Sequence, residues 1–140
     1  MGSVAVLVDA GPLYAYIDAD DAHHARCLAF LTSEPGPLAV PVLVVAEVAY
    51  LVATRLGPDA EVRFLGDLAA RHFVTIPVED DDWLRIAELV ARYRDLPLGT
   101  VDASVVAAAE RLGATIVATL DRRHFAVVRP AHVEAFELVP

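Results

Sequence analysis

The chain has no lysine and a single cysteine, and both shortages narrow what it can be. All eleven of its basic residues are arginine, against 20 acidic residues, which gives a formal net charge of −9. So acidic a chain lacks the basic surface of a non-specific nucleic-acid binder. The absence of lysine argues against a phosphatase or phosphotransfer domain, because such domains usually place a lysine beside the phosphate. With Cys27 alone, an intramolecular disulfide and a multi-cysteine zinc site are excluded.

Several common site motifs are also missing. The sequence contains no glycine-rich phosphate loop, no Gly-Lys-Ser and no Gly-x-Ser-x-Gly, and its histidines lack the spacing of zinc ligands. The N-terminus shows no basic region followed by an apolar run, so we expect no secretory signal and a cytoplasmic location. The apolar stretch 38–53 is short for a bilayer and contains Pro41 and Glu47, so it predicts a core helix rather than a membrane span.

The hydrophobic residues make up 56% of the chain, with a mean hydropathy of +0.49. This fraction is high, so we expect another chain to cover part of the apolar surface. A length of 140 residues predicts one domain, 1–140. Strands are predicted at 4–8, 38–40, 73–76, 115–120, 126–128 and 135–139, and helices at 13–17, 22–31, 41–55, 59–70, 80–93 and 100–112. This alternation predicts a three-layer α/β fold, with a short, mostly parallel central sheet covered by helices on both faces.

Four carboxylates stand at the edges of apolar stretches, where an ordinary soluble domain places none. They are Asp9, Glu47, Asp102 and Asp121. A buried, ionised carboxylate is costly without a partner, and the sequence offers few cations near these acids, which indicates a divalent metal. Asp9 and Asp121 follow predicted strands, whereas the other two lie in predicted helices. The functional crevice of a parallel sheet lies beyond the carboxyl ends of its strands, so we expect all four acids to face one crevice.

Three of these acids also have an ordinary structural explanation. Asp9 can cap the following helix, Asp102 gains from the dipole of its own helix, and Asp121 can pair with a neighbouring arginine. Glu47 resists such an explanation, because Arg55 lies eight residues further along the helix, beyond the reach of an ion pair. Clusters rich in oxygen, without sulfur and with little imidazole, suit magnesium or manganese. The combination therefore favours a site for one of these metals.

The four acids lie in short motifs that follow one another along almost the whole chain. The motifs are Val8-Asp9-Ala10-Gly11-Pro12-Leu13, Ala46-Glu47-Val48, Leu96-Pro97-Leu98-Gly99-Thr100-Val101-Asp102-Ala103-Ser104 and Thr119-Leu120-Asp121-Arg122-Arg123-His124-Phe125. In this order and spacing they resemble the motifs of PIN-domain ribonucleases, and specifically of VapC toxins from bacterial toxin–antitoxin pairs. The resemblance implies a PIN fold and an acidic site for Mg2+ or Mn2+, made by Asp9, Glu47, Asp102 and Asp121. It also implies cleavage of structured RNA such as tRNA or ribosomal RNA, a cognate VapB-like antitoxin that blocks the site, and a homodimer.

One position departs from the pattern of the family. Some relatives carry a further aspartate where this sequence has His124. A fifth carboxylate is therefore missing, and we expect His124 to contact the substrate or a water near the metal. Asp95, seven residues before Asp102, is an additional acid, which we interpret as a supporting or capping residue.

Other polar residues in the motifs have roles that the sequence leaves open. Arg122 and Arg123 are candidates for contacts with phosphate, because the guanidinium group matches its geometry; the alternative is a solvent-exposed charge or a pair with Asp121. The hydroxyls of Thr119 and Ser104 are candidates for orienting waters or carboxylates. Two other functions also remain open: a non-catalytic binding module of the same fold, and a metal-dependent nuclease or phosphatase that is not a toxin.

Overall fold

The computed structural model describes residues 5–140, which form five strands and seven helices. The strands are β1 (Val6–Val8), β2 (Leu38–Pro41), β3 (Val74–Ile76), β4 (Ile116–Ala118) and β5 (Glu137–Val139). The helices are α1 (Ala10–Ile17), α2 (His24–Ser33), α3 (Val42–Leu56), α4 (Pro58–Ala69), α5 (Asp80–Arg92), α6 (Thr100–Leu112) and α7 (Arg122–Val127). Neighbouring strands are all parallel, in the order β3-β2-β1-β4-β5, which confirms the predicted parallel sheet.

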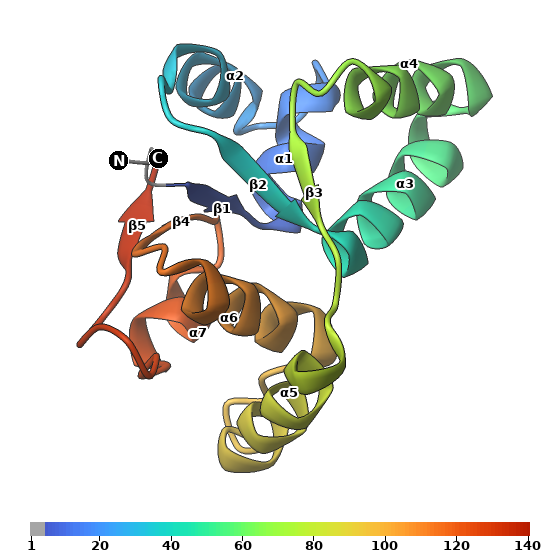
Figure 1. Cartoon of the computed structure of the whole chain (residues 1–140). Coiled ribbons are helices and arrows are strands. Elements are labelled where there is room, and N and C mark those ends of the chain that lie inside the picture. The colour runs from blue at the N-terminus through green and yellow to red at the C-terminus, as the bar shows by residue number, and fades with distance from the viewer. Residues whose placement is uncertain (1–4) are drawn as a thin grey trace.

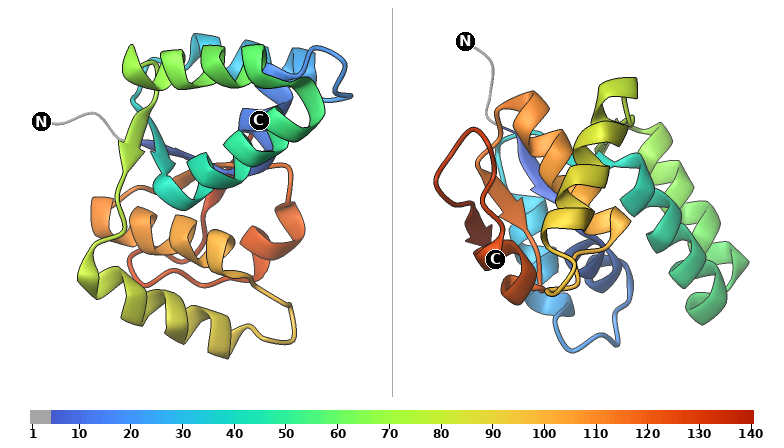
Figure 2. Two further views of the ribbon diagram at one scale, coloured as in Figure 1. Left: turned by 90° about the vertical axis from the view of Figure 1, so that its right-hand side faces the viewer. Right: turned by 90° about the horizontal axis from the view of Figure 1, so that it is seen from below.

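Helices cover both faces of this sheet, as predicted (Figures 1 and 2). The chain moves from β1 to β2 to β3 in one direction across the sheet, and then from β3 to β4 to β5 in the other. Right-handed crossovers therefore place α1 to α4 on one face and α5 to α7 on the opposite face. All three positions of β1 are buried, as expected for an unbroken apolar strand in the middle layer.

The segment 126–128, predicted as a strand, is the one element whose type is wrong. Residues 122–127 instead form helix α7, because the Asp121 carboxylate caps its first turn by accepting a hydrogen bond from the backbone N–H of His124 at 3.2 Å. Phe125 is fully buried on the inner side of this short helix. The cap and this buried ring outweigh the strand preference of Val127 and Val128.

The apolar stretch 38–53 is divided between β2 and α3, and Pro41 ends the strand directly before the helix begins. Within residues 5–140, no helix combines the length and the apolar character needed to cross a membrane. The other predicted elements have the observed type, with ends displaced by a few residues. Val4, which the sequence assigns to the first strand, lies outside the described residues.

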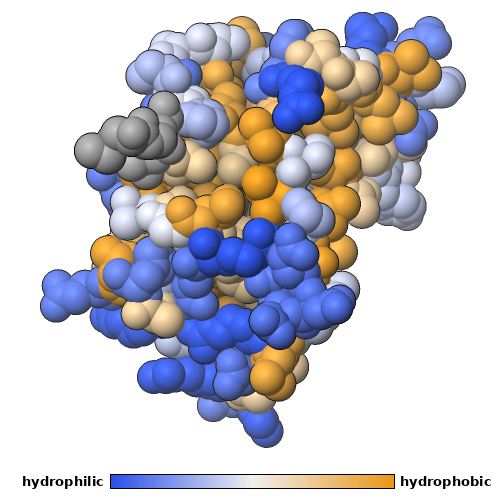
Figure 3. Space-filling model, viewed as in Figure 1, coloured by the Kyte–Doolittle hydropathy of each residue, from blue (hydrophilic) through white to orange (hydrophobic). Residues whose placement is uncertain are grey.

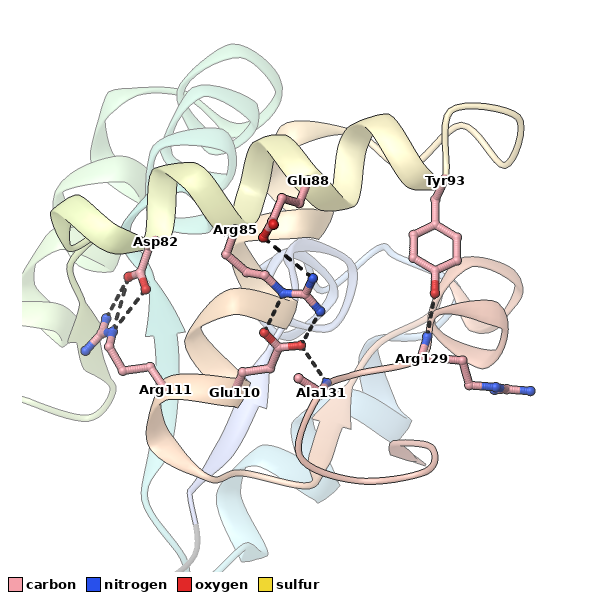
Figure 4. Close-up of polar contacts among 8 residues, drawn as sticks. All are labelled: Asp82, Arg85, Glu88, Tyr93, Glu110, Arg111, Arg129 and Ala131. Atoms are coloured by element: carbon pink, nitrogen blue, oxygen red, sulfur yellow. Dashed lines mark hydrogen bonds and ion pairs between the residues drawn. The ribbon is translucent and has the colours of Figure 1, made fainter.

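Helix α6 is held in place by two ion pairs with α5 (Figure 4). Arg85 forms two parallel hydrogen bonds to the Glu110 carboxylate, both at 2.8 Å, and the same carboxylate accepts a third from the backbone N–H of Ala131. One turn away, the Arg111 guanidinium lies 3.1 Å from the Asp82 carboxylate. These contacts join α5, the C-terminal half of α6 and the segment before β5. They fix the axis of α6, whose first turn points to the carboxyl edge of the sheet.

Candidate metal centre

The site lies at the carboxyl ends of β1 and β4, where the strand order reverses. These neighbouring strands are in register, with Val8 beside Ala118, and the backbone N–H of Asp9 donates to the Ala118 carbonyl at 2.9 Å. The residues that follow the two strands, Asp9 and Thr119, therefore emerge side by side. Crevices at such reversal points are where open α/β sheets bind ligands. The first two residues of the site thus follow directly from strand register.

Thr119 connects two of the four acids. Its side chain is buried, and its hydroxyl donates to Asp9 Oδ2 at 3.0 Å while it accepts the backbone N–H of Asp121 at 2.9 Å. Asp9 precedes helix α1, yet its carboxylate makes no capping hydrogen bond and, from that helix, accepts only the N–H of the adjacent Ala10, so capping does not account for its position. The Thr119 hydroxyl holds this carboxylate at the carboxyl edge of the sheet instead.

The ionised form of the Asp9 carboxylate is destabilised at this position. Burial, with a smaller contribution from the nearby charges of Asp102 and Glu47, raises the pKa of Asp9 from 3.8 to about 6, against hydrogen bonds from Ala10 and Thr119 that lower it. Burial likewise raises the pKa of Asp102, with added repulsion from the carboxylates of Asp121 and Glu47. Each acid therefore lies within electrostatic range of others in the group. A bound cation would reverse these repulsions.

Asp102 and Asp121 meet at His124, and ligand atoms of these three residues all lie within 4.8 Å of one another. The ring Nδ1 of His124 contacts the Asp121 carboxylate and lies 3.4 Å from Asp102 Oδ2. Within residues 5–140 the ion-pair partner of Asp121 is this histidine and not an arginine. On the other side of the ring, Nε2 lies 3.2 Å from the Leu96 carbonyl oxygen. Two predicted acids and the unexplained histidine thus form one cluster.

Glu47 differs from the expectation, because its side chain is exposed rather than buried. The buried stripe of α3 consists of Val44, Val48 and Val52, and Glu47 lies outside that stripe. Of the four acids, Asp9 alone is buried and bears the full free-energy cost of burying a charge. Asp102 and Asp121 are half-buried. Glu47 nonetheless remains near enough to raise the pKa of Asp9 and Asp102, so it lies within electrostatic range of both carboxylates.

The sequence also proposed Asp95, Ser104, Arg122 and Arg123 as supporting residues, and within the range that the structure describes none of their side chains forms a hydrogen bond or ion pair with the four acids. Asp95 is exposed, and its side chain makes no hydrogen bond or ion pair within the described part of the chain. Ser104 is buried and donates to the Val101 carbonyl at 2.6 Å, inside its own helix, rather than to a carboxylate. Both candidate arginines are exposed, but the Arg122 guanidinium donates to the Pro140 carbonyl at 2.7 Å. Arg123 forms no ion pair among residues 5–140.

Sequence reasoning missed the carbonyl of Leu96 and the contact of His124 with Asp102. The spacing of three residues between Asp121 and His124 was a usable signal, because such residues are neighbours on one helical turn. The donor set itself fits a small divalent cation: the carboxylates of Asp102 and Asp121 lie beside Nδ1 of His124, and the pKa of Asp102 and of the neighbouring Asp9 is raised by burial and by repulsion from other acids. The fold and the site together define a small α/β domain with an acidic cluster that could hold a metal ion.

Comparison with known proteins identifies this class. The PIN domain family model matches residues 6–129. The chain is also 36% identical over 135 residues to Ribonuclease VapC26 of Mycobacterium tuberculosis, which covers 96% of this chain and 100% of that protein. The chain therefore belongs to the PIN domain family, and the resemblance to VapC proteins is confirmed.

Solved structures agree on the fold. Mycobacterium tuberculosis VapC20, a Sarcin-Ricin loop cleaving toxin, is similar with a TM-score of 0.80 at 22% identity, over 92% of this chain and 98% of that one. VapBC2 from Rickettsia felis, bound to a DNA fragment from their promoter, is similar with a TM-score of 0.68 at 17% identity, over 96% of each chain. At these identities the structures support the three-layer PIN fold alone.

Proposed function

We propose that the chain is a metal-dependent ribonuclease and the toxin of a toxin–antitoxin pair. The observation that carries this proposal is the cluster of Asp102, Asp121 and His124, whose ligand atoms lie within 4.8 Å of one another, with the carboxylates of Asp9 and Glu47 within electrostatic range of it. Burial, together with repulsion between the acids, raises the pKa of Asp9 and Asp102, so this arrangement is costly unless a cation occupies it. The 36% identity to a protein named as a ribonuclease supports the same activity.

In the proposed reaction the four acids hold Mg2+ or Mn2+. When bound, the ion activates water and offsets the charge that develops on the phosphoryl group. The Thr119 hydroxyl keeps the Asp9 carboxylate at the carboxyl edge of the sheet, and its link to the backbone N–H of Asp121 sets the distance between these two ligands. The exposed Arg123 is available to contact a phosphate of the substrate backbone.

We propose structured RNA, such as a loop of tRNA or ribosomal RNA, as the substrate. The relative VapC20 is named as a Sarcin-Ricin loop cleaving toxin, which supports a loop of this kind. Bases in loops are unstacked and can be recognised by their edges, whereas duplex RNA presents mainly its phosphates. A chain with a net charge of −9 gains little from phosphate contacts alone, so recognition of loop bases suits it better. This activity would take place in the cytoplasm.

We also propose that a VapB-like antitoxin covers the exposed apolar surface. Large apolar side chains gather on α3 and α4, including Tyr50 at 70% and Val62 at 67% exposure, and Figure 3 shows hydrophobic side chains over this region. An adjoining groove runs between α1, α2 and α4, with Leu28 and Phe64 in its lining. The related structure from Rickettsia felis is a VapBC protein, which supports a partner of this kind.

A second copy of the chain is proposed to cover the half-exposed Trp83 on α5, which would give the expected homodimer.

The test of the activity is cleavage of a structured RNA by the purified chain with Mg2+ or Mn2+. The proposal predicts cleavage that a chelator abolishes and that Asp9→Asn and Asp102→Asn variants, shown to be folded by circular dichroism, do not perform. The exposed Asp95→Asn variant is the matched control and should cleave normally. Equal cleavage by the folded Asp102→Asn variant would contradict the proposal, and a chain that binds RNA without cutting it would be a binding module instead.

A further inference from the structure

The ring of His124 is oriented by a backbone carbonyl. Its Nε2 lies 3.2 Å from the Leu96 carbonyl oxygen, in the loop that joins α5 to α6. A carbonyl oxygen can only accept, so Nε2 must carry the hydrogen of this bond. In the neutral ring the other nitrogen, Nδ1, then has a free lone pair. Histidines that bind metals almost always donate their second ring N–H in this way, often to a backbone carbonyl.

The lone pair of Nδ1 faces the acidic cluster. Nδ1 is buried, contacts the Asp121 carboxylate and lies 3.4 Å from Asp102 Oδ2, but none of these contacts has the geometry of a hydrogen bond. The backbone holds the residue in place as well, because the N–H of His124 donates to Asp121 Oδ1 at 3.2 Å. In the neutral ring these contacts set a lone pair against two carboxylates, which is unfavourable, and a cation bound by all three groups would remove the repulsion.

We propose that His124 is itself a ligand of the metal, through Nδ1, and that it shifts the preference of the site from Mg2+ toward Mn2+. This inference rests on the proposed metal site and names a nitrogen ligand within it. Mg2+ is a hard ion that takes oxygen ligands almost exclusively, whereas first-row transition ions accept imidazole readily. Exchanging one oxygen for a nitrogen therefore weakens Mg2+ more than Mn2+. A relative with aspartate at this position would have an all-oxygen site.

The direct test is electron spin-echo spectroscopy of the whole protein loaded with Mn2+. A coordinated imidazole couples its nitrogen to the electron spin of manganese, and this coupling is absent when all ligands are oxygens. The unaltered chain is expected to show the coupling. His124→Asp should still bind Mn2+ but lose the coupling, and its preference for Mn2+ over Mg2+, measured by competition, should fall about tenfold or more. His72→Ala, which alters an exposed histidine 3.4 Å from Asp67, should retain both.

The outcomes separate this inference from the proposed function. Bound Mn2+ without nitrogen coupling in the unaltered chain, or coupling that persists in His124→Asp, would overturn the assignment of His124 while leaving the acidic metal site intact. In that case the histidine is a structural ion-pair partner of Asp102 and Asp121. Failure of the unaltered chain to bind Mn2+ at all would overturn the assignment together with the metal-dependent activity. Circular dichroism of each variant establishes that the comparison is made between folded proteins.

Discussion

The cost of the buried Asp9 carboxylate leads to an unusual prediction, namely that removing it stabilises the protein while abolishing its activity. The substitution Asp9→Asn keeps the shape of the side chain, and the amide oxygen can still accept the Thr119 hydroxyl that now lies 3.0 Å from Oδ2. What it removes is a negative charge that burial and two neighbouring carboxylates disfavour. In protein freed of divalent ions, we therefore expect the variant to be the more stable of the two.

The magnitude follows from the pKa of Asp9, which burial raises from 3.8 to about 6. Because the folded-state value lies above the unfolded one, the unfolded chain loses this proton first as the pH rises. The free energy of unfolding consequently falls between about pH 4 and pH 6 and stays low above that range. At about 1.4 kcal/mol per pKa unit, the ionised carboxylate costs about 3 kcal/mol at pH 7. Asparagine avoids this cost at every pH.

The assay is urea denaturation of both proteins in chelator, at several pH values from 4 to 8. Asp9→Asn should be more stable by about 2–3 kcal/mol at pH 8, and the difference should narrow as the pH approaches 4. Added Mn2+ should stabilise the unaltered chain and not the variant. Asp95→Asn, at an exposed acid, should leave stability unchanged. An Asp9→Asn protein that is less stable at pH 8, or a difference that does not depend on pH, would refute the reasoning.

Three further predictions concern the support of the site and its substrate contacts. Thr119→Val removes the hydroxyl that joins two ligands, so metal affinity measured by calorimetry should fall about 10–100-fold with the fold preserved. Arg85→Ala leaves the partly buried Glu110 carboxylate without the two hydrogen bonds from Arg85, so the free energy of unfolding in urea should fall by about 1–3 kcal/mol. An unchanged denaturation midpoint would show that the ion pair does not stabilise the fold. Arg123→Ala should weaken binding to all RNA sequences about equally and reduce the slope of its salt dependence by about one. Arg122→Ala should have the smaller effect, because the Arg122 guanidinium already donates to the Pro140 carbonyl. A larger effect of Arg122→Ala would argue against a contact between Arg123 and phosphate.

The positions of Asp9 and Asp121 could be predicted from sequence because each follows a short apolar strand. Strands buried on both faces read as unbroken apolar runs, and the carboxyl ends of parallel strands meet at one edge. The order of the strands then decides which ends are neighbours, and β1 pairs with β4. The sequence therefore predicts that both acids lie at this edge, whereas their proximity depends on the pairing of β1 with β4, which the structure supplies.

The features that sequence did not predict depend on helix phase and on the backbone. The exposure of Glu47 is set by which stripe of α3 faces the core, and a helix that is apolar on most sides does not reveal this in its sequence. The partner of His124 is the carbonyl of Leu96, a group that every residue possesses and that only the path of the loop brings close. Helix α7 was missed because Asp121 was interpreted as a metal ligand or as the partner of an arginine and not as a helix cap, although one oxygen of its carboxylate accepts the N–H of His124.

The central claim is that the converging acids make this chain a nuclease of structured RNA, and cut-site mapping tests it most directly. After brief induction in bacterial cells, the 5′ ends of all RNAs are sequenced for the unaltered chain and for a folded Asp102→Asn variant expressed to the same level. The account predicts new ends at a few discrete positions within loops of tRNA or ribosomal RNA, present with the unaltered chain and absent with the variant. Identical maps for the two proteins, or no new ends with either, would contradict it.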